Sequence, residues 1–385
     1  MIIFAVQFFV YLLWKTRGAY TNFLKNKILR IILAFIVPIL FLFFVNFKKD
    51  SSIGRVFIWK TCYNLILEKP IFGHGFASFE KVYNREQGNY FRNIVKKDFA
   101  FKNEEVQLAD HIEFPYNDFL EIFIEGGSIA LLLYIIFICD SIIGIFKIKL
   151  RDGDSFCAII ILLSFLVQSM FWFGIKVPVF SIPLFIGLAI SSKNRTSRLN
   201  RGIYYYFFLL VFSIFIVVFS INKQLQYYKF RVFINDMTSK RISTYKLGQI
   251  HFGNDVILAN QELGKIYIQF CISRNEYLKA KDIIVAQLEW RSDPDLLLML
   301  GDVYKKLNNI SKAEDCYLKA FYIAPNRLRP IYLLVLLYYE NDLIEEAKKT
   351  AVLFLNKQAK TPSADAYLMG EEIKFLLNQR RGNKK

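Results

Sequence analysis

A basic and an aromatic residue at helical spacing give the first indication of chemistry in this chain. Arg55 and Trp59 are four residues apart, so a helix would place the guanidinium and the indole on one face. A permanently charged, planar guanidinium suits a diphosphate, to which it can donate paired hydrogen bonds. The same pair is also typical of helices anchored at lipid headgroups, and the pair alone does not decide between these interpretations.

A turn rich in glycine and aromatic residues follows. The sequence Pro-Ile-Phe-Gly-His-Gly-Phe occupies 70–76, with Gly73 and Gly75 on either side of His74. Glycine has no side chain and tolerates left-handed backbone conformations. The pattern therefore predicts that the backbone of this turn approaches another group closely.

Carboxylates make up the third feature. Asn117, Glu121 and Glu125 recur every four residues, so a helix entering the membrane would present all three on one stripe. Carboxylates at a membrane are costly unless they are paired or functional. The alternative interpretation is a solvated helix end.

The composition indicates the class of protein to which these features belong. Hydrophobic residues make up 54% of the 385 residues, and the mean hydropathy is +0.30, which is too apolar for one soluble globule. Four apolar runs approach the roughly 20 residues needed to cross a bilayer: 28–47, 127–147, 155–174 and 203–221. A shorter apolar run at 177–192 is predicted to return the chain across the membrane, and residues 1–14 are typical of a shortened span rather than a signal peptide.

The net charge of +17 is concentrated in short segments between the predicted spans. Basic residues cluster at 15–30, 147–151 and 193–201, whereas basic and acidic residues are nearly balanced in the long segment 48–126. All three clusters fall on one side of the alternating spans, so the positive-inside rule places them in the cytoplasm. The long segment and the C-terminal region then face outward, and no nucleic-acid partner is predicted.

The C-terminal third has the period of a helix-turn-helix repeat. Ala280, Ala313 and Ala347 recur at spacings of 33 and 34 residues, and prolines at 294, 325 and 362 are expected to close the units. Small residues let paired helices approach closely, while tyrosines such as Tyr304, Tyr317 and Tyr338 fill the gaps. The pattern resembles tetratricopeptide repeats, most clearly at 294–327. Such a stack could bind a partner protein in its concave groove, or it could only pack against the membrane domain or cap itself.

Together these features predict an all-α protein, a polytopic transmembrane helix bundle with a large periplasmic loop, followed by a helical repeat domain. Five scattered cysteines and three dispersed histidines indicate neither a disulfide framework nor a metal site, and no metal or cofactor is expected. The expected divisions are transmembrane helices at 1–47 and 127–221, a loop with the candidate site at 48–126, a linking segment at 222–258 and repeats at 259–380.

In their order along the chain, the motifs resemble the shared domain of the O-antigen ligase and O-antigen polymerase superfamily. The resemblance covers roughly 28–192 and rests on Arg55-x3-Trp59, the turn at 70–76, Asn117-Asp-Phe-Leu and Glu125-Gly126 before an apolar span. The residues Tyr-Asn-x2-Gln at 83–87 and Leu-Ala-Asp at 108–110 are similar to a subgroup that carries C-terminal repeats. Family members usually contain more spans, so the chain is expected to lack N-terminal spans of the bundle.

The resemblance implies transfer of a glycan from an undecaprenyl-diphosphate carrier to a lipid, glycan or protein acceptor. The reaction would occur at the periplasmic face of the bacterial inner membrane, without metal or nucleotide. Arg55 would hold the diphosphate leaving group and stabilise its developing charge. The turn residues Gly73, His74 and Gly75, with Trp59, would also contact substrate.

The resemblance also implies a general base that activates the acceptor hydroxyl. Family ligases usually have His immediately before the Asn that matches Asn117, whereas this chain has Tyr116, and tyrosine is a poor base at neutral pH. The candidate catalytic residues are therefore Arg55, His111, Tyr116, Asn117, Glu121 and Glu125, with Asp110 as a further candidate base.

Two other functional classes remain alternatives. A non-catalytic assembly protein could use a shortened membrane domain to display the repeats to a partner. A transporter could use Asp140 and Gln168, which lie within predicted spans, although each is isolated.

Overall fold

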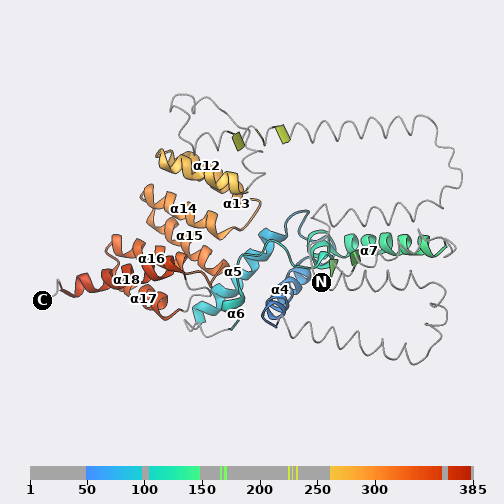
Figure 1. Ribbon diagram of the computed structural model, residues 1–385, viewed down its shortest axis with the longest axis horizontal. Coiled ribbons are helices and arrows are strands. Elements are labelled where there is room, and N and C mark those ends of the chain that lie inside the picture. The colour runs from blue at the N-terminus through green and yellow to red at the C-terminus, as the bar shows by residue number, and fades with distance from the viewer. Residues whose placement is uncertain are drawn as a thin grey trace. The chain divides into compact units, whose positions relative to one another are not determined.

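The computed structural model describes residues 49–97, 104–147, 261–357 and 363–382, with a few single positions between 165 and 232 (Figure 1). Within these ranges every regular element is an α-helix, which agrees with the predicted all-α class. The predicted spans at 28–47, 177–192 and 203–221, the run 1–14 and almost all of 155–174 and of the linking segment 222–258 lie outside the described residues.

The described residues form two compact units. The first contains residues 49–87 and 112–147, and the second contains 88–97, 104–111, 261–357 and 363–382. Helix α5 (Phe79–Lys97) contributes its first half to one unit and its second half to the other. The segment predicted as a single loop, 48–126, therefore supplies residues to both units.

The first unit is built from α4 (Lys49–Glu68), the start of α5 and α7 (Asp118–Lys147). Spacings of three and four residues give α4 one face directed at the core, where Ile58, Cys62 and Leu65 are buried. Ile124 from α7 is fully buried in the same cluster. From α5 the cluster takes Phe79, Val82 and Tyr83.

Helix α7 is longer than the span predicted at 127–147. It begins at Asp118 because Asn117 satisfies backbone N–H groups of the first turn. Residues Asp118–Asp140 are long and apolar enough to cross a membrane, and this is the one such helix among the described residues. The helix is interrupted at Gly127, whose φ of 69° and ψ of −170° are not helical.

The second unit contains three helix hairpins in succession (Figure 1). They are α12 (Gln261–Ser273) with α13 (Tyr277–Leu288), α14 (Pro294–Lys306) with α15 (Ile310–Ile323), and α16 (Arg329–Glu340) with α17 (Ile344–Asn356). Helix α18 (Ala364–Gly382) follows them. Each hairpin turns at a residue with positive φ, namely Asn275, Asn308 and Asp342. These turn residues recur with the same period as the alanines.

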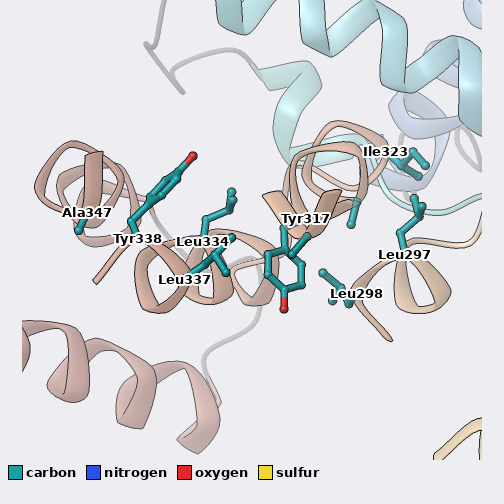
Figure 2. Packing of buried hydrophobic residues seen from close by; sticks show 10 residues of the cluster. Leu297, Leu298, Tyr317, Ile323, Leu334, Leu337, Tyr338 and Ala347 are labelled. Atoms are coloured by element: carbon teal, nitrogen blue, oxygen red, sulfur yellow. The ribbon is translucent and has the colours of Figure 1, made fainter. Parts of the chain in front are cut away.

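Close helix packing in the repeats depends on small residues, as predicted. A side chain at Gly301 would place its Cβ 2.3 Å from a ring carbon of Tyr317, so glycine leaves the space that this ring fills. Tyr317 is 1% exposed, and its hydroxyl donates a hydrogen bond of 2.6 Å to Asp302. Figure 2 shows the ring of Tyr317 between the leucines of α14 and those of α16. The recurring Ala280, Ala313 and Ala347 are all buried.

The prolines mark the repeat boundaries differently from the prediction. Pro294 was expected to close a unit, but it is the first residue of α14, and Asp293 accepts a hydrogen bond from the Asp295 backbone N–H. A proline at the first helical position loses no hydrogen bond, because that N–H has no partner inside a helix. Pro325 lies between α15 and α16, and Pro362 is outside the described residues.

The second unit also includes part of the predicted loop. The end of α5 and the short α6 (Glu104–Leu108) are joined by a hydrogen bond from the Tyr90 hydroxyl to Glu105. Gly88 lies against Ile323 of α15, where a Cβ would be 3.3 Å from the isoleucine side chain. Arg327 donates to Asp110 at 3.0 Å and to Asp295 at 3.1 Å. The edge of the central hairpin therefore holds residues from 88–97 and 104–111.

Candidate functional site

The predicted face of Arg55 and Trp59 contacts the segment immediately before α7. The guanidinium carbon of Arg55 lies 5.7 Å from the centre of the Tyr116 ring. One helical turn later, Trp59 Nε1 donates a hydrogen bond of 3.0 Å to the carbonyl of Pro115. Two side chains of α4 thus hold two consecutive residues of the loop.

Tyr116 and Asn117 form the turn that starts α7. Tyr116 has a φ of 55°, a left-handed conformation that costs a non-glycine residue roughly 1 to 2 kcal/mol. Asn117 Oδ1 accepts hydrogen bonds from the backbone N–H groups of Phe119 at 3.0 Å and Leu120 at 3.1 Å. Asn117 was expected on the helical stripe with Glu121 and Glu125, but it lies just outside the helix as its cap.

The turn at 70–76 is fixed to α7 on both sides of Gly127. The bonds run from His74 N to Ile124 O, Gly75 N to Glu125 O and Ser128 N to Pro70 O, each at 2.8 Å, and from Ile129 N to Ile71 O at 3.4 Å. These bonds use carbonyl and N–H groups that the interruption of the helix leaves without helical partners. The turn and the interrupted helix therefore stabilise each other.

Two glycines make this contact possible. A Cβ on Gly127 would lie 2.0 Å from the carbonyl oxygen of Ile71, and a Cβ on Gly73 would lie 2.5 Å from the carbonyl of Glu125. Both glycines have positive φ, at 69° and 68°. The close backbone approach predicted for the turn is confirmed, and the group that it approaches is α7. Substrate contacts of Gly73, His74 and Gly75 stay predictions.

His74 and Glu125 add side-chain contacts to the same junction. His74 Nε2 lies 3.0 Å from the carbonyl oxygen of Leu65, near the end of α4. Glu125 Oε1 accepts a hydrogen bond of 3.3 Å from the backbone N–H of Phe79, at the start of α5. A carboxylate at that position also interacts favourably with the positive end of the helix dipole. Glu125 therefore joins α7 to α5.

Glu121 lies on the inner face of α7. Its side chain is 5% exposed, and its backbone N–H donates to the carbonyl of Asn117 at 3.1 Å. Burial raises the pKa of the Cys62 thiol on α4 well above its usual range, and the negative charge of Glu121 adds to this effect. The carboxylate therefore lies close to α4, the helix that carries Arg55.

Asn84 anchors the loop that carries Tyr116 and Asn117. It is fully buried, and its side-chain amide exchanges two hydrogen bonds with the backbone of Ile112, at 2.8 and 3.0 Å. The amide nitrogen also donates to the carbonyl of Glu80 at 2.7 Å. One side chain of α5 thus fixes the loop several residues before α7.

His111 and Asp110 belong to the second unit. The side chain of Asp110 accepts from Arg327 and from the backbone N–H of His111, the latter at 2.8 Å. Burial alone would raise the pKa of the Asp293 carboxyl. The hydrogen bond and charge of Lys265 outweigh the effect of burial and, together with the nearby His111, hold the pKa of Asp293 below its usual value. Both residues are thus close to the repeats.

Arg55, Trp59, Tyr116, Asn117 and Glu121 together form a junction of α4 with the start of α7, which we call the α4–α7 junction. It offers a guanidinium fork, a phenol and a carboxylate, a set suited to binding an anionic leaving group and accepting a proton. In the part of the chain that the structure describes, no group of three or more His, Cys, Asp and Glu side chains could hold a metal ion.

Two residues whose contacts support this junction, Gly127 and Asn84, were not predicted from the sequence. Gly127 was read only as the first residue of a span, yet it interrupts α7 and receives the turn. The signal was two consecutive glycines, Gly126 and Gly127, at the change from acidic to apolar sequence. Asn84 was noted only as part of a motif. No sequence pattern marks a partner as distant as Ile112.

Comparison with known proteins finds two families in this chain. Residues 1–135 match the O-antigen ligase family, and residues 294–327 match the tetratricopeptide repeat family. No curated protein and no solved structure matches the chain. The first match includes the α4–α7 junction, and the second coincides with α14, α15 and Arg327. The two matches agree with the resemblances that the sequence motifs carry, to the O-antigen ligase family in the N-terminal region and to tetratricopeptide repeats in the C-terminal third.

Proposed function

We propose that this protein is a membrane glycosyltransferase of the O-antigen ligase or polymerase type. It moves a glycan from undecaprenyl diphosphate to a lipid, glycan or protein acceptor during synthesis of a surface polysaccharide. The observation that carries the proposal is the placement of Arg55 over Tyr116 at the start of α7, inside the region that matches the O-antigen ligase family.

In this proposal Arg55 binds the diphosphate. The acceptor hydroxyl oxygen forms a bond to the anomeric carbon of the glycan, and the bond from that carbon to the diphosphate oxygen breaks. The leaving diphosphate takes the bonding electron pair, and its negative charge is stabilised by the guanidinium. The guanidinium carbon lies 5.7 Å from the centre of the Tyr116 ring, and the attraction between cation and ring helps to hold Arg55 at the start of α7.

Glu121 is the proposed acceptor of the hydroxyl proton. Of the candidate bases, Glu121 and Glu125 lie in the same unit as Arg55. Glu125 already accepts the backbone N–H that begins α5, whereas Glu121 lies one turn from Asn117 and close to α4. As a carboxylate, Glu121 can take up the proton that the acceptor hydroxyl releases.

The membrane arrangement follows from the predicted spans and charges. The proposal places the chain in the inner membrane as a polytopic bundle, with the basic segments in the cytoplasm and the loop and the repeats in the periplasm. The repeats bind a partner protein in their concave groove. Support comes from the regular hairpins α12–α13, α14–α15 and α16–α17.

The alternative function is a non-catalytic assembly protein that displays the repeats. Three ordered hairpins with continuous cores favour it, because such stacks are typical protein-binding surfaces. The two functions differ in what they require of Arg55, and a substitution at this position separates them.

The experiment compares surface glycans in a deletion strain that carries the wild-type chain, Arg55→Ala, Arg55→Lys or Arg85→Ala. Arg85 is exposed on α5 in the same unit and provides the matched control. We expect the wild type and Arg85→Ala to restore the glycan profile, Arg55→Ala to lose it, and Arg55→Lys to retain a small part. Lysine keeps the charge but lacks the planar fork.

The length of the transferred glycan distinguishes the two reaction types. Addition of long chains to the acceptor indicates a ligase, and chain growth by single repeat units indicates a polymerase. Full restoration by Arg55→Ala, with normal protein levels in the membrane, would contradict the transferase proposal and favour the assembly protein.

A further inference from the structure

Large hydrophobic side chains project from the turn that is fixed to α7. Ile71 is 54% exposed, Phe72 is 78% exposed and Phe76 is 97% exposed. The backbone of the turn is nevertheless tied to α7 by four hydrogen bonds, so these side chains are held outward by an ordered structure. Exposed aromatic side chains in an ordered turn mark an interaction surface.

The interruption at Gly127 separates two halves of α7 with different chemistry. The half before it carries three carboxylates, Asp118, Glu121 and Glu125. The half from Ser128 to Lys147 is apolar, with Asp140 as its one charged side chain before the final lysine. At 1.5 Å per residue this second half is about 30 Å long, which equals the hydrocarbon thickness of a bilayer.

The water-facing end of the span is therefore close to Gly127, rather than at Asp118 where the helix begins. Placing the three carboxylates of the first half within the hydrocarbon would be costly. Soon after Ser128, in contrast, the exposed side chains are apolar: Leu132 is 59% exposed and Leu133 is 61% exposed. The turn is bonded to Ser128 and Ile129, so it lies at the depth where the chain enters the lipid.

We propose that the turn from Ile71 to Phe76 is seated in the headgroup layer of a phospholipid bilayer, with Phe72 and Phe76 as its anchors. Phenylalanine side chains of interfacial segments bury into the boundary between headgroups and acyl chains, and backbone groups next to the hydrocarbon need hydrogen-bond partners. The bonds from the turn to α7 provide partners for the N–H groups of His74 and Gly75 and for the carbonyls of Pro70 and Ile71. The proposal concerns ordinary phospholipid and does not depend on the transferase activity.

The test uses a photoreactive amino acid in the full-length chain. p-Benzoylphenylalanine replaces Phe72 or Phe76, which are exposed aromatic residues, so no core contact is lost. The controls carry it at Glu113 or Arg85, which are exposed in the same unit, Glu113 lying ahead of the acidic half of α7. The purified chains are placed in vesicles of phosphatidylethanolamine and phosphatidylglycerol that contain an alkyne-tagged phospholipid and no glycan carrier.

We expect irradiation to attach tagged phospholipid to positions 72 and 76 several-fold more efficiently than to positions 85 and 113. Equal yields at all four positions would overturn the proposal, as would attachment of positions 72 and 76 to a second copy of the chain instead of lipid. Because the vesicles contain no substrate, a negative result here leaves the transferase test unaffected.

Discussion

The α4–α7 junction and the repeats are both helical, but different contacts hold them together. In the repeats, side chains interlock through a pattern that recurs every 33 or 34 residues, and small residues such as Gly301 give tyrosine rings their space. Around the junction, the backbone of the turn at 70–76 meets the backbone of α7 at Gly73 and Gly127, and the side chain of Asn84 holds the loop at Ile112. A backbone neighbour cannot move aside as a side chain can, so we expect substitutions at Gly73 and Gly127 to be tolerated less well than a substitution at Gly301.

The largest effect is expected for Gly127→Ala. The new Cβ would lie 2.0 Å from the Ile71 carbonyl, and alanine would have to adopt a φ of 69°. Overpacking and backbone strain together predict a destabilisation of about 2 to 4 kcal/mol. Limited proteolysis of membranes that contain the Gly127→Ala protein should show more cleavage near residues 70–78 than membranes with the wild type.

Gly54→Ala is the matched control for that experiment, because a Cβ at Gly54 meets nothing within 4 Å. It is expected to resist proteolysis at least as well as the wild type. Equal protection of Gly127→Ala and Gly54→Ala would show that the contact of the turn with α7 is not needed for order.

Asn84→Ala is expected to cost slightly less. It removes the three hydrogen bonds of a fully buried side chain and leaves the N–H and carbonyl of Ile112 without these partners. The predicted loss is about 2 to 3 kcal/mol, from the desolvation of buried backbone groups. Hydrogen exchange in detergent should increase at residues 112–117, whereas Asn93→Ala, on the exposed side of α5, should leave it unchanged.

A substitution in the repeats should behave differently because side chains can move. Gly301→Ala places a Cβ against the ring of Tyr317, with a predicted cost of about 1 to 3 kcal/mol. A second change, Tyr317→Leu, should recover part of that stability in thermal unfolding, since it removes the clashing ring. If no change at Tyr317 recovers stability, the repeats tolerate added volume at a glycine no better than the contact of the turn with α7 does.

The repeats and the α4–α7 junction also differ in how well the sequence predicts them. The repeats were predictable because Ala280, Ala313 and Ala347 report a period that many residues share. Arg55 and Trp59 predicted a common helical face, but their spacing says nothing about Pro115 and Tyr116, which lie far along the chain. Contacts between segments distant in sequence have no local signal. The capping role of Asn117 is local, because its side chain bonds the N–H groups of Phe119 and Leu120, and it was missed because Asn117 also fits the four-residue spacing of Glu121 and Glu125.

A further prediction is a pH dependence of stability within the repeats. Lys357 is 7% exposed, and burial lowers the pKa of its ammonium group to about 7. Its nitrogen donates to the carbonyls of Pro325 and Arg327. An unfolded lysine has a pKa of roughly 10.4. Between these two values the unfolded chain binds more protons, so stability should rise with pH from about 7 to 10 and be lowest below pH 7.

Thermal unfolding of the full-length chain in detergent at several pH values checks this sign. Lys357→Met should flatten the rise between pH 7 and 10, and Lys349→Met, on the exposed side of α17, should not. A wild-type stability that falls over this interval while Lys357→Met stays flat would mean that the charged form of Lys357 is the stabilising one.

The most direct test of the account is the amount of undecaprenyl-diphosphate-linked glycan in membranes of the deletion strain that expresses Arg55→Ala. Mass spectrometry of extracted lipids would compare it with strains that express the wild-type chain and Arg85→Ala. If Arg55 holds the leaving diphosphate, the carrier-linked glycan accumulates in Arg55→Ala alone, although the protein reaches the membrane at the normal level. Carrier-linked glycan at the wild-type level in Arg55→Ala would contradict the account.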